Sequence, residues 1–120
     1  MAKELNIIKG EDRVPTLYLT KKTTKRPFDL TGATEIEVRI PKDGGTIVKK
    51  LTSPSPDTVS LVGNAVLGAI SFQLSDTNTN EMKAQEDQSI EVIVDFGTTR
   101  RKANFKQVLN VYEDSVAAGA

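Results

Sequence analysis

The sequence contains no histidine, no cysteine and no tryptophan, and these absences narrow the chemistry available to the protein. Without cysteine there is no disulfide framework and no thiolate metal site, so the fold does not depend on the redox state of its compartment. Without histidine the usual general base near neutral pH is missing, and cysteine, the most reactive nucleophile, is missing as well. We therefore expect no enzyme and no cofactor, although serine–lysine or paired-carboxylate chemistry stays open in principle.

The sequence also lacks an excess of charge of either sign. Lysine and arginine together number 16, as do aspartate and glutamate. Nucleic-acid binding favours a strongly basic face, so no nucleic-acid partner is expected. A net charge of zero does little to keep copies apart, so self-association is not opposed.

Long apolar runs are absent too. No stretch approaches the roughly 18 apolar residues of a membrane span, and the first residues, MAKELNIIKGEDR, lack the apolar run of a signal peptide. We expect no membrane contact, and a protein that is made in a cytoplasm and stays soluble there or leaves as part of something larger.

What remains is the composition of one globular domain. The chain has 120 residues, of which 38% are apolar and 27% charged. A domain of this size buries roughly two-thirds of its surface, which is enough for a core. We assign residues 1–114 to the domain and residues 115–120, SVAAGA, to a small-residue tail without core-building power.

Alternation of apolar and polar residues predicts short β-strands. The clearest case is residues 34–40, TEIEVRI, and the same period recurs in residues 90–96. The polar residues after Gly97 suit a hairpin turn, and the return strand lies within residues 103–113. The other predicted strands are residues 5–9, 14–21, 46–51, 58–62 and 66–74.

Breaks and caps divide these strands. Pro41 is expected to end its strand, and Gly68 to weaken its strand or mark a bulge. The connector, residues 75–87, holds the only helix signal: Ser75 or Asp76 caps a turn or two running through residues 80–84. The pattern predicts an all-β protein, an antiparallel β-sandwich of about seven strands with one short helix in a crossover.

Several local patterns occur in the order found in one family. They are D-L-T-G-A at residues 29–33 before the alternating strand, L-S-D-T at residues 74–77 with Met82-Lys83 after it, and the final hairpin. They resemble the immunoglobulin-like domains of tailed-bacteriophage virion proteins, in particular the N-terminal domain of siphophage upper-baseplate proteins. The resemblance covers roughly residues 7–114 and implies a single immunoglobulin-like sandwich without enzymatic residues. Residues 86–89 depart from the pattern, because they lack the glycine and the aromatic residue that such domains often carry there.

The resemblance implies a non-enzymatic structural component of a phage particle. Upper-baseplate proteins have further domains, so we expect a small baseplate, tail, neck or head-decoration protein, made in the host cytoplasm and located in the virion. Its partners would be other virion proteins and copies of itself. The alternative is a carbohydrate- or receptor-binding module. The lack of tryptophan and the presence of only two tyrosines argue against a sugar site.

Some apolar residues fall opposite the predicted core and are candidates for an interface. If they converge on one sheet they form a contact patch, although a bulge that shifts the register would explain them equally well. These residues are Ile8, Tyr18, Ile93, Val108 and Tyr112.

Charged and polar residues offer weaker candidates. Arg100 and Arg101 belong to a basic hairpin tip that is either solvated or paired with an acidic neighbouring subunit. Outward carboxylates on the strands are interpreted as surface charge. The pattern Asp76-x-Asn78-x-Asn80 resembles the start of a calcium loop, but residue 81 is not the glycine that the motif needs. A helix cap explains the same residues, so no metal is expected.

Overall fold

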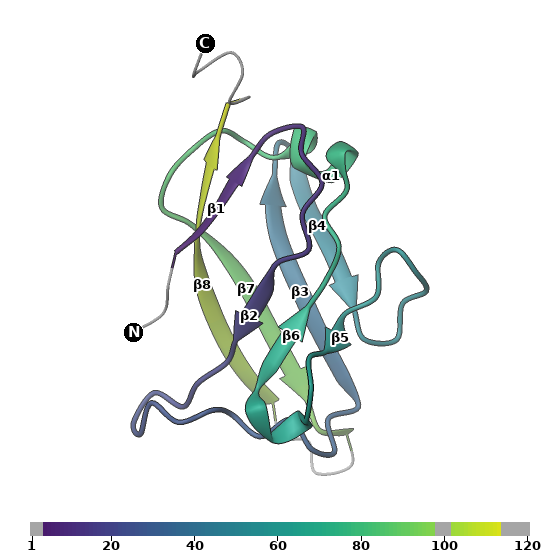
Figure 1. The fold of residues 1–120 in the computed structure, drawn as a ribbon, viewed down its shortest axis with the longest axis vertical. Helices are drawn as coiled ribbons and strands as arrows, with labels where there is room; N and C mark the ends of the chain where they lie inside the picture. The colour runs from purple at the N-terminus through teal and green to yellow at the C-terminus, as the bar shows by residue number, and fades with distance from the viewer. Residues whose placement is uncertain (1–3, 98–101, 114–120) are drawn as a thin grey trace.

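The computed structural model describes residues 4–97 and 102–113, which form a β-sandwich of two facing sheets (Figure 1). The larger sheet has the order β1-β8-β7-β3-β4 and the smaller one the order β2-β6-β5. The strands are β1 (Leu5–Ile8), β2 (Thr16–Tyr18), β3 (Glu35–Lys42), β4 (Gly45–Lys50), β5 (Ser60–Leu61), β6 (Ala69–Ser71), β7 (Gln88–Asp95) and β8 (Lys102–Tyr112). The described helices, η1 (Ala65–Leu67) and α1 (Asp76–Glu81), are both too short to cross a membrane.

Alternating side chains from both sheets fill the space between them. In β3 and β7 every second residue points inward and is fully buried, as the alternation predicted. These residues are Ile36, Val38, Ile40, Ile90, Val92 and Val94. The smaller sheet contributes Leu17 and Ile70, which are register partners in β2 and β6. Each such side chain contributes roughly 1.5–3 kcal/mol through its removal from water. The predicted all-β sandwich is confirmed.

One strand pair departs from the antiparallel pattern. β1 runs parallel to β8, with Leu5 opposite Leu109 and Ile8 opposite Tyr112. Parallel neighbours need a long connection between them, and here nearly the whole domain provides it. The first and last strands of the described chain therefore share one side of the larger sheet.

Two local predictions are wrong. Pro41 does not end β3, which continues to Lys42 opposite β4. The last β3 residue that pairs with β7 is Arg39, opposite Glu91. Beyond it no strand lies on that side of β3, so the backbone N–H that proline lacks is not needed there. Residues 66–74 are not one strand, because they begin with η1 and only residues 69–71 belong to β6.

Gly68 explains where that strand begins. It ends η1 in the left-handed conformation, with φ of +66°. A Cβ atom at this position would lie 2.7 Å from the carbonyl oxygens of both Leu19 and Phe28. The glycine therefore allows three backbone segments to pack closely, since no side chain intervenes.

The predicted connector helix is present but shorter than expected. Ser75 caps α1: its hydroxyl accepts the Asn78 N–H at 3.1 Å, and the Asn78 side chain accepts the Ser75 N–H at 3.1 Å. The helix ends at Glu81 rather than near residue 84. Met82 takes an extended conformation and its side chain is fully buried in the core.

A buried lysine joins three parts of the fold. Lys49 occupies an inward position of β4, two residues after Ile47, and is only 1% exposed. Its Nζ donates to Asp57 Oδ1 at 2.8 Å and to Asn78 Oδ1 at 3.0 Å. The ammonium thereby links β4, the loop before β5 and the first turn of α1. These charge-assisted hydrogen bonds offset the cost of its burial.

The close packing at Gly68 predicts a difference between two glycine substitutions. Gly44 also has a positive φ, +76°, but a Cβ there would meet no atom within 4 Å. Gly44→Ala should lower the free energy of unfolding by roughly 1–2 kcal/mol through the left-handed backbone alone. Gly68→Ala should cost roughly 1–3 kcal/mol more because of the steric clash. Urea denaturation of both variants measures this, and equal losses would contradict the packing argument.

The Lys49 network predicts a rescue. Asp57→Ala should destabilise the protein by about 1–3 kcal/mol, because it leaves the buried ammonium with one partner fewer. Adding Lys49→Met to Asp57→Ala removes that charge and keeps the volume, so the double variant should be more stable than Asp57→Ala. Denaturant unfolding of both variants decides the sign. A double variant less stable than Asp57→Ala would contradict this account.

Candidate protein-interaction site

An exposed aliphatic cluster lies in the segment that leads from β5 into η1. Of the nine large apolar side chains exposed among the described residues, four fall between residues 61 and 67. They are Leu61, Val62, Val66 and Leu67, with exposed fractions between 38% and 51%. We refer to these four residues as the β5–η1 cluster. Scattered exposed apolar residues are ordinary, so this concentration in one short segment is the candidate for a contact surface.

The backbone beneath this cluster is fixed by hydrogen bonds. The Asn64 side chain caps η1 by accepting the Val66 N–H at 3.2 Å, and the Asn64 carbonyl accepts the Leu67 N–H at 2.9 Å. The Ala65 carbonyl accepts the Leu30 N–H at 3.0 Å, which ties η1 to the chain after β2. The apolar side chains are therefore displayed on an ordered turn.

The predicted outward patch is only partly brought together. Ile8 and Tyr112 are register partners on the outer face of the larger sheet, and Val108 lies on the same face of β8. Asn110 stands between Val108 and Tyr112. It is buried there, accepting the Asp87 N–H at 2.8 Å and donating to Asn6 Oδ1 at 3.1 Å. A polar pair thus separates Val108 from the other two residues.

The remaining predicted residues lie elsewhere. Ile93 is on the same outer face, but its register partners are Glu37 and Asn104, so its surroundings are polar. Tyr18 belongs to β2 in the other sheet and is 70% exposed. Arg100 and Arg101 lie outside the described residues. Their roles in an interface stay predictions.

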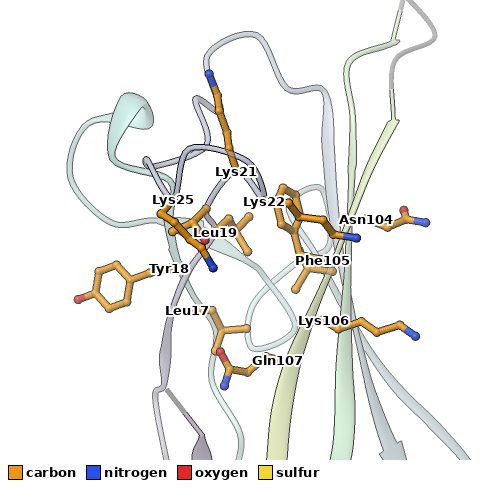
Figure 2. Close-up of a pocket in the computed structure, with 12 residues that line it drawn as sticks. Leu17, Tyr18, Leu19, Lys21, Lys22, Lys25, Asn104, Phe105, Lys106 and Gln107 are labelled. Carbon is orange, nitrogen blue, oxygen red and sulfur yellow. The ribbon is translucent and has the colours of Figure 1, made fainter. Parts of the chain in front are cut away.

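A pocket of about 280 Å³ opens between β2 and β8, on the side of the sandwich away from β4 (Figure 2). Apolar residues from both sheets line it, as do four lysines. The apolar residues include Leu17, Leu19, Val92 and Phe105, and the lysines are Lys21, Lys22, Lys25 and Lys106. No acidic residue lines the pocket, so its electrostatic character is positive.

The calcium-like pattern serves a different purpose. Asp76 and Asn78 lie in α1, where Asn78 Oδ1 accepts hydrogen bonds from Ser75 and Lys49, and Asp76 Oδ1 accepts the Thr77 N–H at 2.7 Å. Within residues 4–97 and 102–113, no group of three acidic side chains is placed to hold a metal ion. The polar residues of this stretch cap a helix and hold Lys49.

Comparison with known proteins gives no further assignment. No protein-family model matches the chain, and no curated protein sequence matches it significantly. The β5–η1 cluster and Lys49 were both missed by the sequence reasoning. The adjacent apolar pairs at residues 61–62 and 66–67 do break the period of two, and Asn64 between them is a cap residue. That combination is the signal that could have identified the cluster.

Tyr112, at the edge of the predicted patch, has a perturbed side chain. Its hydroxyl donates to Glu86 Oε1 at 3.1 Å. Desolvation, followed by the hydrogen bond and negative charge of Glu86, raises the pKa of the Tyr112 phenol above its ordinary value. The folded state therefore holds this proton more tightly than the unfolded chain does. The resulting stability is complete below about pH 10 and is lost as the pH rises through the folded pKa.

An absorbance titration of the Tyr18→Phe variant, whose only tyrosine is Tyr112, tests this shift. The phenol pKa should lie above the ordinary tyrosine value. Adding Glu86→Gln should lower it only partly, because desolvation remains. A phenol that titrates at or below its ordinary value would contradict the contact with Glu86.

Proposed function

We propose that the protein is a non-enzymatic structural component of a tailed-phage particle and acts through protein–protein contacts. The observation that carries this proposal is the β5–η1 cluster, four aliphatic side chains displayed on one ordered segment. Burial of apolar surface contributes roughly 25 cal/mol per Å², so a partner that covers this cluster gains stability. The zero net charge of the chain offers little resistance to such association.

The strand order supports the finer identity, an immunoglobulin-like domain. Variable-type immunoglobulin domains place strands C′, C, F and G in one sheet and strands B, E and D in the other. Assigning β2 to B, β3 and β4 to C and C′, β5 and β6 to D and E, and β7 and β8 to F and G reproduces this order. β1 then takes the place of the first strand, beside G. This agreement supports the family resemblance of the sequence motifs without deciding where in the virion the domain sits.

In this proposal the sandwich is a rigid body that holds contact surfaces apart. The β5–η1 cluster begins with Leu61 at the end of the smaller sheet and continues into η1, and the Ile8–Tyr112 pair lies on the outer face of the larger sheet. Two separate surfaces allow one copy to contact two neighbours, either other virion proteins or copies of itself.

A carbohydrate- or receptor-binding module is the second candidate, and one observation favours it. Tyr18 is highly exposed and lines the pocket between β2 and β8. Its ring points away from the other lining side chains, so it presents an apolar face and a hydroxyl beside the pocket rather than inside it (Figure 2). A sugar that binds there should be lost with Tyr18→Ser while self-association is kept.

Light scattering across a concentration series tests assembly through the β5–η1 cluster. Val66→Ser/Leu67→Ser should weaken self-association at least tenfold, which is about 1.4 kcal/mol. The free energy of unfolding should change by no more than about 0.5 kcal/mol per exposed position. Val14→Ser/Val48→Ser, at two exposed valines elsewhere, is the matched control and should assemble normally.

In the same series, Tyr18→Ser/Ile93→Ser tests the outward residues predicted from the sequence. A wild-type protein that stays monomeric throughout would contradict self-assembly through the cluster. So would a cluster variant that associates as tightly as wild type.

A further inference from the structure

Part of β8 has an unpaired edge. β7 pairs with β8 from Lys102 to Leu109, whereas β1 pairs with it only from Leu109 to Tyr112. Figure 1 shows β1 beside one half of β8, while the other half has no strand on that side. The half of β8 that contains Asn104 and Lys106 is therefore an edge strand of the larger sheet.

The alternation of peptide groups identifies what this edge offers. The Val111 N–H donates to Gln85 on the β7 side, and the Tyr112 carbonyl accepts the Lys9 N–H on the β1 side. Because successive peptide groups of a strand point to opposite sides and the register with β7 is unbroken, even-numbered residues face the β1 side. Asn104 and Lys106 thus direct their N–H and C=O groups to the open edge. Neither has another backbone partner within the described residues.

The pocket beside this edge combines an apolar floor with a positive rim. Leu17, Val92 and Phe105 contribute to the floor, and Val92 is fully buried. Lys22 and Lys25 come from the segment after β2, across the pocket from Asn104 and Lys106 of β8 (Figure 2). None of the four lysines that line the pocket forms an ion pair with any described carboxylate. Glu91 lies opposite Lys106 in β7 and Asp29 is near enough to feel the charge of Lys21, so the unpaired positive charge of the rim comes mainly from Lys22 and Lys25.

The charge selects among possible occupants. Lysines on a free edge often only prevent unwanted pairing. Here, however, Lys22 and Lys25 lie outside β8, on the opposite wall of a pocket with an apolar floor. A second copy that paired through the same edge would bring lysines against lysines, which opposes that occupant. An extended segment with alternating carboxylate and apolar side chains matches both the rim and the floor.

We propose that the open edge of β8 at Asn104 and Lys106 binds an extended acidic segment of a partner protein as an added strand. Main-chain hydrogen bonds join the segment to β8. Its apolar side chains enter the pocket, and its carboxylates, which alternate with them, lie on the outer face of the larger sheet beside Lys106. This proposal rests on the proposed function in so far as both invoke protein–protein contact, and it names the chemistry of the partner. It uses a different surface from the β5–η1 cluster.

A fluorescent, acetylated hexapeptide that alternates glutamate and valine is the probe, and fluorescence anisotropy is the measurement. It should bind the full chain at low salt and weaken as salt is added. A peptide of alternating glutamine and valine should bind at least tenfold more weakly. A glutamate–valine peptide N-methylated at alternate residues, on the edge that would pair with β8, should not bind, because it lacks the hydrogen bonds of a ladder.

Two protein variants and one amide measurement locate the site. Lys106→Glu, on the outer face where the carboxylates of the added strand lie, should weaken binding at least fivefold. Lys83→Glu makes the same charge change at an exposed lysine outside the pocket and should have little effect. The bound peptide should slow hydrogen exchange of the Asn104 and Lys106 amides at least tenfold.

Absence of peptide binding at low salt would overturn the proposal. The lysines would then only prevent unwanted strand pairing at this edge. Equal binding of the N-methylated peptide, or binding without protection of the Asn104 and Lys106 amides, would overturn it as well. Self-association is measured without peptide on the β5–η1 variants, so failure of one proposal is distinguishable from failure of the other.

Discussion

The three-stranded sheet covers only part of the five-stranded one. This mismatch leaves a gap between the sheets at each side of the sandwich, and the two gaps are treated differently. On the β4 side the gap is closed, because the Lys49 ammonium reaches Asp57 and Asn78 and the Val59 N–H donates to the Lys50 carbonyl. On the β8 side no such bridge spans the described residues, and the space becomes a pocket. One charged group thus replaces apolar packing where the smaller sheet ends, which works only because both of its partners are held by the surrounding chain.

The difference between the two sides also divides structural from functional roles. Lys49 is buried and donates to two partners, so it is unavailable to a ligand, although it is chemically the same residue as the lysines around the pocket. Those lysines are exposed and form no ion pair with a described carboxylate. The β5–η1 cluster adds a third surface, apolar and placed on a tight turn. A contact module needs this combination of a closed interior and distinct, fixed surfaces.

Sequence reasoning succeeded where structure depends on local alternation and failed where it depends on distant contacts. β3 and β7 were predicted with their buried residues because a period of two is readable within eight residues. Pro41 was misjudged because its tolerance depends on where β7 stops. Gly68 was placed inside a strand because its contacts, Leu19 and Phe28, lie about 40 residues or more away. Lys49 and the open edge of β8 have no local signal, since they depend on Asp57, Asn78 and the short length of β1.

The parallel pairing of β1 with β8 has a mechanical consequence. Because the two strands run in the same direction, a pull on the N-terminal end of β1 and the C-terminal end of β8 slides them past one another along their length. The four register pairs from Leu5–Leu109 to Ile8–Tyr112 then carry the load together instead of opening one at a time. A domain joined to its neighbours through these two strands would resist tension in shear, the geometry in which a short ladder is hardest to break.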